Sequence, residues 1–266
     1  MPDPLEFALA TARAAGQILC RLYDKHHSVH FKSSDIDIVT EADIASEQLI
    51  VGAIRQEFPG HRILSEEGLG TLDALVADSA PVWLVDPLDG TVNYAHGFPL
   101  WGVSLALAES GRVRTAVTFD PLHDQIYWAE AGQGAWRNGT RLQVSGAADL
   151  RQALVATGFA YKRATLTDNN LAEFSAVMPG VQGVRRGGSA VLDLAYLAAG
   201  QLDGYWEMHL NPWDWAAGWL LVEEAGGRVT DMRGEPWALS SGDMVATNGS
   251  LHDELLARLA RAHHQQ

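Results

Sequence analysis

The order of two hydrophobic patterns along the chain is the strongest constraint on how it can fold. Residues 5–24 carry apolar side chains at helical spacing, whereas residues 82–136 contain consecutive strand-like segments and lead to the Asn138-Gly139 turn. After residue 150 the two patterns alternate in short pieces. This mixed order favours stacked layers of helices and sheets over a helix bundle or an all-β barrel. In the second half, helices are predicted at 168–178, 189–199, 213–225 and 249–262, and strands at 154–157, 204–207, 228–230 and 244–247.

Two helices are predicted before residue 60. The buried face of the first is expected to contain Leu5, Leu9, Ala12, Ala15, Ile18, Leu19 and Leu22. The second begins after Thr40 and ends at Pro59-Gly60, and its buried face is expected to contain Ile44, Leu49, Ile54 and Phe58. Cys20 lies within the first helical pattern, so we interpret it as a small core residue. As the sole cysteine, it cannot form an internal disulfide.

Length and composition limit the class of protein. The chain has 266 residues, 47% of them hydrophobic, which is enough for one substantial core or two closely apposed half-cores. The small residues at 145–148, Ser-Gly-Ala-Ala, can serve as a hinge. We therefore expect an N-terminal half at 1–145 and a C-terminal half at 146–266 that form one compact unit. No export signal or membrane span is expected, and a cytoplasmic location fits. The formal net charge of −14 argues against nucleic acid as a partner.

Asp86 and Asp89 are the sharpest chemical feature of the chain. The predicted strand at 83–85 leads into Asp86, and Pro87 favours a turn that brings Asp89 back to the same point. Two carboxylates a few Å apart repel each other unless a proton or a cation lies between them, and oxygen ligands suit Mg²⁺, Mn²⁺ or Ca²⁺. An ordinary surface turn is the alternative, because Asp-Pro and Asp-Gly are common turn dipeptides.

Gly90 and Thr91 follow at the predicted start of a short helix. Backbone N–H groups at a helix start have no helical partner, and a glycine allows a phosphate oxygen to approach them closely. A phosphate site would therefore adjoin the metal site.

Three further acidic positions occur where strands end or helices begin. Glu66 or Glu67 follows a short apolar segment, Asp214 lies in the first turn of an apolar helix, and Asp43 lies at the start of the second predicted helix. Each has an ordinary alternative: Asp214 as a helix cap, Asp43 as the third residue of a capping box, and the glutamates as solvated loop residues. Their joint occurrence with the first two aspartates favours a metal site.

Four motifs carry a resemblance to a known family. They are DIVTEAD at 37–43, LSEEG at 64–68, WLVDPLDGTVNY at 83–94 and WDWAAGWLLVEEAGG at 213–227. In this order and spacing they resemble the signature of the inositol monophosphatase family, bacterial type, within the lithium-sensitive, magnesium-dependent sugar phosphatase superfamily. The resemblance runs from about residue 5 to the C-terminus. It implies an α/β (α+β) fold, a layered α/β/α/β/α sandwich like that of fructose-1,6-bisphosphatase, together with a homodimer and inhibition by lithium.

The resemblance also implies a set of metal ligands and a group that prepares the attacking water. The ligands would be Glu66, Asp86, the backbone carbonyl of Leu88, Asp89 and Asp214. The spacing to Asp86 in the family pattern selects Glu66 over Glu67. Asp43 and Thr91 would orient the water, and Glu66 would act through the ion that activates it. Two or three Mg²⁺ per site are implied, with Mn²⁺ as an alternative ion.

Substrate contacts are implied from both halves of the chain. They are Asp89, Gly90, Thr91, Gly188, Ser189, Ala190, Glu207 and Asp214. Without the resemblance, Gly188 reads as part of a plain helix start and Glu207 as a surface strand residue. With it, Glu207 favours a neutral polyol, because a second phosphate placed there would meet a negative charge.

We therefore expect a magnesium-dependent phosphomonoesterase that hydrolyses myo-inositol monophosphate or a similar small sugar or polyol phosphate with metal-activated water. The first alternative is the same chemistry on fructose 1,6-bisphosphate, histidinol phosphate, a nucleotide 3′-phosphate or NADP. The alternative of another class is a regulatory RNA- or protein-binding protein with secondary phosphatase activity.

Overall fold

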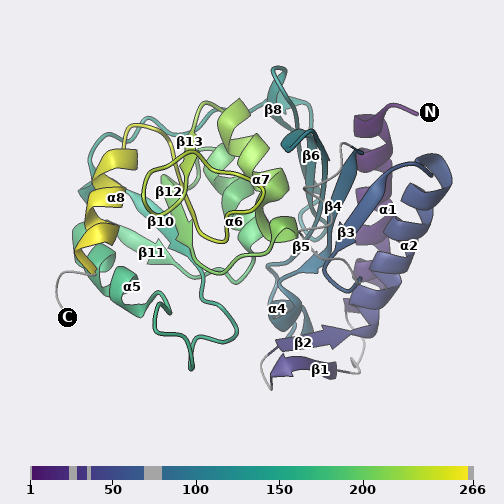
Figure 1. Ribbon diagram of the computed structural model, residues 1–266, viewed down its shortest axis with the longest axis horizontal. Helices are drawn as coiled ribbons and strands as arrows, with labels where there is room; N and C mark the ends of the chain where they lie inside the picture. The colour runs from purple at the N-terminus through teal and green to yellow at the C-terminus, as the bar shows by residue number, and fades with distance from the viewer. Residues whose placement is uncertain (1, 24–28, 35–36, 69–79, 263–266) are drawn as a thin grey trace.

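The computed structural model describes residues 2–23, 29–34, 37–68 and 80–262. Helices and sheets alternate across the molecule in five layers (Figure 1). An outer helical layer is followed by a seven-stranded sheet, a central pair of helices, a five-stranded sheet and a second outer helical layer. The layered α/β/α/β/α sandwich expected from the sequence is therefore confirmed.

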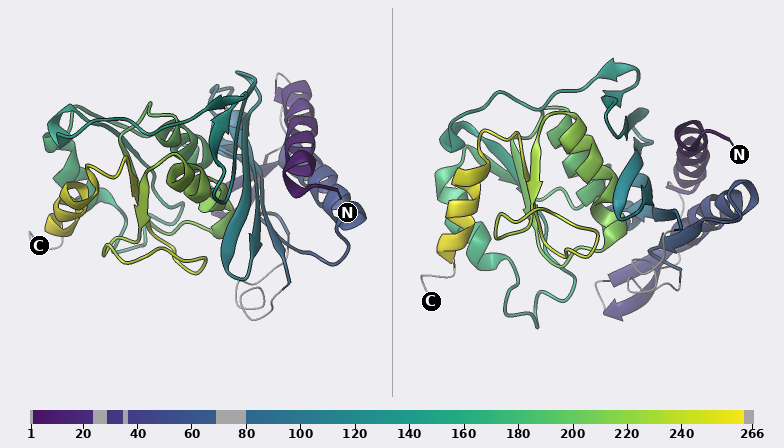
Figure 2. Two further views of the ribbon diagram at one scale, coloured as in Figure 1. Left: turned by 90° about the horizontal axis from the view of Figure 1, so that it is seen from above. Right: turned by 45° about the horizontal axis from the view of Figure 1, so that its top comes forward.

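Helices α1 (Pro4–Tyr23) and α2 (Glu41–Glu57) form the outer layer on the larger sheet (Figures 1 and 2). Of the residues predicted for the buried face of α1, Leu5, Ala12, Ala15 and Leu19 are buried, and Ala8 joins them. The predicted Leu9, Ile18 and Leu22 are half-buried. Cys20 is exposed, so the expectation that it belongs to the core is wrong. It follows Leu19 directly and therefore lies about 100° around the helix from the buried stripe.

The buried face of α2 also differs from the prediction. Ile44 is 41% exposed, although it was expected to be buried. Ile54 and Phe58 are buried as predicted, and Leu49 is half-buried. The rest of the buried stripe consists of Ala42, Asp43, Ser46 and Ile50. Two of these residues are polar, and Ser46 donates a hydrogen bond of 2.7 Å to the backbone oxygen of Pro87. Hydrophobicity alone misplaces this stripe because polar residues with partners on the sheet occupy part of it.

The larger sheet has the strand order β3-β4-β5-β6-β7-β8-β9. Strands β3 and β4 are parallel, and the later neighbours pair antiparallel. The bounds are β3 (Arg62–Ser65), β4 (Val82–Asp89), β5 (Gly102–Glu109), β6 (Arg112–Asp120), β7 (Gln125–Glu130), β8 (Gly134–Arg137) and β9 (Thr140–Arg141). An antiparallel hairpin that was not predicted, β1 (Val29–Ser34) with β2 (Asp37–Thr40), precedes α2.

The smaller sheet is mixed and has the order β11-β10-β12-β14-β13. Strand β10 is parallel to β11 and β12, whereas β14 is antiparallel to β12 and β13. The predicted strands correspond to β10 (Leu154–Thr157), β12 (Gly204–Glu207), β13 (Arg228–Thr230) and β14 (Met244–Thr247), while β11 (Gly183–Arg185) was not predicted. Helices α5 (Leu171–Val177) and α8 (His252–Arg261) form the second outer layer, as Figure 2 shows.

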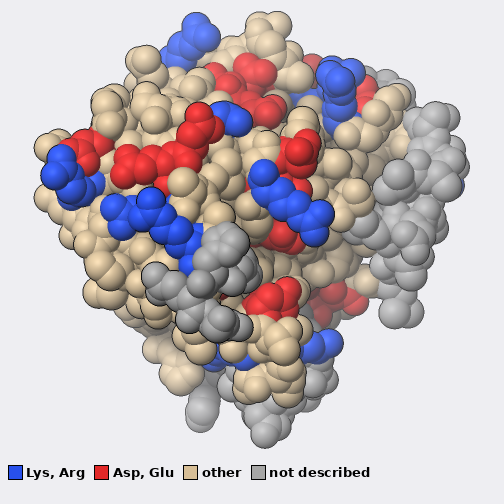
Figure 3. Space-filling view, turned by 60° about the vertical axis from the view of Figure 1, so that its left-hand side comes forward, with Lys and Arg blue, Asp and Glu red and all other residues tan. Residues whose placement is uncertain are grey.

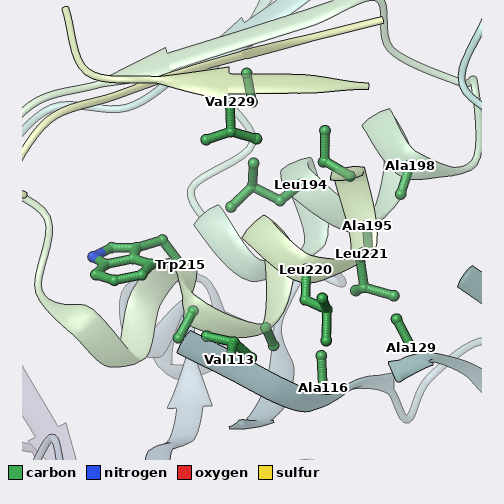
Figure 4. Packing of buried hydrophobic residues seen from close by; sticks show 14 of the residues in the cluster. Val113, Ala116, Ala129, Leu194, Ala195, Ala198, Trp215, Leu220, Leu221 and Val229 are labelled. Atoms are coloured by element: carbon green, nitrogen blue, oxygen red, sulfur yellow. The ribbon is translucent and has the colours of Figure 1, made fainter. Parts of the chain in front are cut away.

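Helices α6 (Ala190–Ala198) and α7 (Pro212–Glu224) lie between the two sheets and are the centre of the largest hydrophobic cluster. Figure 4 shows side chains of these helices between Ala116 on the larger sheet and Val229 on the smaller one. The cluster therefore joins both sheets into one core, and this core fixes the position of the two helices.

The two central helices approach each other closely at Gly218. A Cβ atom on this residue would lie 2.4 Å from Cδ1 and 2.5 Å from Cβ of Leu194. Gly52, on the exposed face of α2, has no atom within 4 Å of the equivalent position. The two glycines thus share a helical setting and differ in packing.

We expect Gly218→Ala to lower the free energy of unfolding by about 1–3 kcal/mol, because the added methyl group overpacks the interface between α6 and α7. Gly52→Ala should raise it by about 0.5–1 kcal/mol, because alanine loses less backbone entropy in a helix. Urea denaturation of both variants checks this prediction. Equal effects of the same sign would contradict it.

Candidate active site

A pocket of about 460 Å³ opens where the larger sheet meets the starts of α6 and α7. All of the predicted site residues except Asp43 line it, and Asp43 reaches it through Thr91. Of the two adjacent glutamates, Glu66 lies in the lining, directly after β3. The structure thus brings the predicted residues together, and their roles as ligands and substrate contacts remain predictions.

Strand β4 places Asp86 and Asp89 in the pocket by means of an irregularity in its pairing. Asp86 pairs with Ser104 and Asp89 with Gly102 on β5, so β4 has one residue more than its partner between the two pairs. Such a bulge bends a strand and changes where its side chains point. Asp86 is 1% exposed and its Oδ1 accepts a hydrogen bond of 3.1 Å from the backbone N–H of Leu88. The surface-turn alternative is therefore excluded. The turn expected at Pro87 is also wrong, because the strand continues through Pro87 to Asp89.

Gly90 ends this strand in a conformation that favours glycine. Its φ is +88°, and a Cβ atom would lie 3.0 Å from the backbone oxygen of Leu100 and 3.3 Å from that of Gly188. The short helix α4 (Thr91–Ala95) follows, as predicted. The missing side chain thus lets the end of β4 approach the loop before α6.

Asp43 and Thr91 form a hydrogen-bonded pair beside the pocket. Thr91 Oγ1 lies 3.0 Å from Asp43 Oδ1 and 3.0 Å from the backbone oxygen of Leu88. The other oxygen of Asp43 accepts hydrogen bonds from the N–H and hydroxyl of Thr40, which completes a capping box at the start of α2. Burial raises the pKa of Asp43 to about 6, against the lowering effect of these hydrogen bonds. The capping alternative and the contact with Thr91 are therefore both correct.

Asp214, at the start of α7, likewise belongs both to a helix cap and to the pocket. Its Oδ2 accepts a hydrogen bond of 2.7 Å from the backbone N–H of Asn211, within a capping box. Burial, followed by repulsion from Glu66 and Asp89, raises the pKa of Asp214 well above its usual value. The helix cap holds this carboxylate at the pocket.

Negative charge accumulates in the pocket. Burial and the charges of Glu66, Asp89 and Asp214 raise the pKa of Asp86 well above its usual value. Burial raises the pKa of Asp89 to about 6, although the hydroxyl of Ser189, backbone N–H groups and the charge of Arg186 lower it. Carboxyl groups in such surroundings need either a proton or a cation to offset their repulsion.

The donors fit a hydrated divalent cation. Carboxylate and carbonyl oxygens are the ligands that Mg²⁺ and Mn²⁺ prefer. Within the described ranges, no three His, Cys, Asp or Glu side chains close around a single point. Mg²⁺ keeps several of its waters when carboxylates bind it, so it needs only some of the oxygens that line this pocket.

Ser189, one of the predicted substrate residues of the C-terminal half, contacts Asp89 at the end of β4 directly. The Ser189 hydroxyl and the Val191 N–H both donate hydrogen bonds to Asp89 Oδ2. Gly188 has a φ of +88°, which glycine adopts without strain. The start of α6 is therefore attached to the end of β4.

Glu207 lies in the pocket at the end of β12 and accepts a hydrogen bond from the hydroxyl of Tyr205. Burial raises the pKa of Glu207 to about 7, partly offset by this hydrogen bond and by the charge of Arg186. The reading of Glu207 as a surface strand residue is therefore wrong.

Two pocket features were missed by reasoning from the sequence. Asp193 lines the pocket, is 4% exposed, and has a pKa raised well above its usual value by burial and by repulsion from Glu207 and Asp89. An acidic residue in the otherwise apolar segment AVLDLAYLA was a usable signal for it. Residues 158–162 and His209 also line the pocket, and no pattern in the sequence points to them.

Comparison with known proteins decides the family. A sequence profile described as the inositol monophosphatase family matches residues 2–265. The chain belongs to the inositol monophosphatase family. Its members generally depend on a metal ion, in agreement with the oxygen donors of the pocket.

Individual members of the family are similar over nearly the whole chain. A Pseudomonas aeruginosa protein named Nus factor SuhB is 42% identical over 262 residues, 97% of this chain and 96% of the relative. A Synechocystis sp. protein named Inositol-1-monophosphatase is 42% identical over 256 residues, 96% of this chain and 88% of the relative. The solved structure of inositol monophosphatase from Anabaena (Nostoc) sp. has a TM-score of 0.86 at 43% identity and covers 97% of this chain and 95% of that one.

The predicted family membership and fold are thereby confirmed, and the chain is an inositol-1-monophosphatase-like phosphoric monoester hydrolase. Among the described residues, no helix is both long enough and apolar enough to cross a membrane.

We expect Asp89→Asn to stabilise the metal-free protein at neutral pH. A folded-state pKa of about 6, against 3.8 for an unperturbed aspartate, means that the fold favours the protonated carboxyl. Its contribution to stability is present below pH ~4 and is lost as the pH rises through ~6. In EDTA at pH 7 the variant should therefore be more stable than the wild type by roughly 1–2 kcal/mol, and the difference should nearly vanish at pH ~4.

Excess Mg²⁺ should reverse this order, because an ion that binds the native wild type more tightly stabilises it more. Urea denaturation with EDTA or Mg²⁺ measures both effects. A variant that is less stable than the wild type in EDTA at pH 7, or a wild type that Mg²⁺ does not stabilise, would contradict the assignment of Asp89 to a metal site.

Proposed function

We propose that this protein hydrolyses a small sugar or polyol phosphate, with myo-inositol monophosphate as the first candidate, by means of Mg²⁺-activated water. One observation carries the proposal: the carboxylates at the ends of β3 and β4 and at the start of α7 share a pocket with the Asp43–Thr91 pair. A metal ion held by oxygen ligands beside a fixed hydroxyl group is suited to directing a water molecule at phosphorus.

The proposed ligand sets are those that the family resemblance implies, and all of their residues line this pocket. Glu66, Asp86 and the Leu88 carbonyl would hold one ion, and Asp86, Asp89 and Asp214 a second, with Mn²⁺ as an alternative to Mg²⁺. When bound, the ions would lower the pKa of a water molecule and offset charge on the phosphate.

Thr91 would position the attacking water. Its hydroxyl has one hydrogen, and Asp43 Oδ1 and the Leu88 carbonyl are both within hydrogen-bond distance of it. Since either acceptor can take that hydrogen, a lone pair of Thr91 can accept a hydrogen bond from water. Asp43 would thereby fix the orientation of the hydroxyl, and the buried capping box fixes Asp43.

The alcohol part of the substrate would lie toward the C-terminal half. Glu207 and the buried Asp193 provide carboxyl groups for hydroxyl groups, while Gly188, Ser189 and Ala190 line the pocket beside Asp89. Glu207, when it is ionised, favours a neutral polyol over a second phosphate, because two negative charges would repel each other. We propose fructose 1,6-bisphosphate, histidinol phosphate, a nucleotide 3′-phosphate and NADP as the comparison substrates.

A second candidate function is suggested by the relatives. Several carry the name Nus factor SuhB, including that of Escherichia coli strain K12 at 39% identity. We keep a regulatory role, with RNA or a protein as partner, as the alternative. On the face shown in Figure 3, basic and acidic side chains of the described residues are interspersed, so that face favours a protein partner over RNA. RNA binding measured by fluorescence anisotropy tests this alternative directly.

We also propose that the chain forms a homodimer, that lithium inhibits it, and that residues 1–145 and 146–266 act as two halves of one compact unit. Phe98, Leu171 and Met178 are each more than half exposed and are candidates for contacts with a partner subunit. Light scattering of the purified protein measures the oligomeric state.

The test of the proposed activity is phosphate release from the substrate panel with Mg²⁺, with EDTA, and with Mg²⁺ plus Li⁺. We expect Thr91→Val to lower kcat by ~10²-fold or more, because positioned proton-transfer and water-orienting groups contribute on that scale. The matched control is Thr118→Val on β6, where the hydroxyl is buried and has no hydrogen-bond partner within the described part of the chain.

Thr118→Val should retain turnover, because it replaces an unsatisfied buried hydroxyl with a methyl group of similar shape. Absence of metal-dependent phosphate release from every substrate would overturn the proposal and favour the regulatory alternative. A clear preference for a bisphosphate would overturn only the choice of substrate.

A further inference from the structure

His209 has a backbone conformation that residues other than glycine adopt rarely. Its φ is +61°, in the left-handed region. The residue lies in the turn between Glu207, at the end of β12, and Asn211, the N-cap of α7, and its side chain lines the pocket. The next residue, Leu210, is fixed by a hydrogen bond of 2.7 Å from its N–H to the backbone oxygen of Gly242. Strained conformations of this kind persist where surrounding contacts hold them, and they cluster at functional sites.

The imidazole of His209 contacts Asp168, which belongs to the loop that carries the pocket residues Tyr161, Lys162 and Leu166. Its Nε2 lies 3.0 Å from the backbone oxygen of Asp168 and 3.3 Å from the Oδ2 atom of that residue. An Nε2–H group can donate to both oxygens, and the carboxylate adds charge attraction when the ring is protonated. This contact joins the turn before α7 to the segment that follows β10.

Residues 158–170 form a compact loop with its ends fastened together. Asn170 is 1% exposed, and its Nδ2 donates hydrogen bonds of 2.6 Å to the Gly158 backbone oxygen and 2.8 Å to Thr157 Oγ1. The Oδ1 atom of Asn170 accepts a hydrogen bond of 2.7 Å from the indole of Trp206. A loop closed at its base in this way can hold its shape while its tip adjusts, and such loops frequently carry function.

Two acidic residues from different loops, Asp168 and Asp243, interact electrostatically with His209. Asp168 contacts the ring. The pKa of Asp243 is raised by burial and by the charge of Asp231, and the charges of His209 and Arg233 lower it. Both neighbouring loops therefore offer negative charge to the imidazole. The side chains of His209 and Asp168 are 35% and 49% exposed, so the contact is of modest strength and can open.

We propose that His209 and Asp168 form a latch that holds residues 158–170 as a wall of the pocket and thereby sets how tightly the alcohol part of the substrate is bound. Three residues of this loop line the pocket: Tyr161, Lys162 and Leu166. The turn that carries His209 also connects Glu207 to the helix of Asp214. The inference rests on the proposed phosphatase function of this pocket, and His209 acts in it as a positioning residue.

The kinetic test compares KM with kcat for His209→Gly. Glycine accepts the positive φ without strain, so the variant should fold with an unchanged or higher Tm. Loss of the latch should raise KM about fivefold, the scale of a partly exposed ion pair, while kcat and the Mg²⁺ concentration for half-maximal activity change less than twofold. Asp168→Asn should raise KM less, because its backbone oxygen remains an acceptor. The double variant should equal His209→Gly, since both changes remove one interaction.

A second readout does not depend on activity. Lys162 and Arg163 lie in the loop, and trypsin cleaves after both residue types. Without the latch, the loop should open more often and be cut several-fold faster at these positions. The matched control is Asp124→Gly, because Asp124 also has a positive φ, of 48°, and forms an exposed ion pair with Arg13, whereas it does not line this pocket.

Asp124→Gly should leave both KM and the cleavage rate at wild-type values. If His209→Gly leaves KM within twofold of the wild type, the latch does not act on substrate binding and the proposal is wrong, whatever the cleavage rate. If the wild type releases no phosphate, the proposed function fails. In that case an unchanged cleavage rate would also overturn the latch, whereas faster cleavage would support the latch as a structural contact.

Discussion

Mutual repulsion among Asp86, Asp89 and Asp214 is the interaction to which the architecture around the pocket is adapted. Asp86 is buried, Asp89 and Asp214 are half-buried, and desolvation is the largest cause of the raised pKa of each. Each is held in place by donors of its own chain: the bulged end of β4 for the first, the start of α6 for the second, and the capping box of α7 for the third. Their positions thus depend on secondary structure, so the charge cannot relax by simple side-chain rotation toward solvent.

The pocket also joins the two sheets of the fold. Asp89 at the end of β4 accepts hydrogen bonds from Ser189 and Val191, and Asn93 donates from its amide to the backbone oxygen of Gly187. These contacts are reinforced by the shared core around α6 and α7. The carboxylates therefore lie on elements fixed from several sides, whereas the wall at 158–170 is a loop. The carboxylates proposed for the chemistry are therefore held in fixed positions, whereas the loop at 158–170, proposed to affect substrate binding, can change its conformation.

The sequence was informative wherever local pattern and local chemistry agreed. Four strands of the C-terminal half, β10, β12, β13 and β14, follow from the sequence pattern, as do the helix after Thr40 and the acidic positions at strand ends. The family resemblance selected Glu66 between two adjacent glutamates. The sequence failed where tertiary contacts decide the outcome. Polar partners moved the buried stripe of α2 away from Ile44, and Cys20 lies just outside the stripe of α1. The backbone conformation of His209 depends on contacts with residues distant in the sequence, so no local sequence pattern predicts it.

The two capping boxes have a consequence for how sequence variation at this site is interpreted. Asp43 completes the start of α2, and Asp214 completes the start of α7. Each carboxylate is therefore needed for a helix to begin correctly as well as for the pocket. In a saturation-mutagenesis map scored only by protein abundance, both positions would stand out even if the enzyme had no substrate in that cell. Intolerance to substitution at these two aspartates therefore reflects both folding and catalysis. Separating the two contributions requires one assay of stability and one of activity.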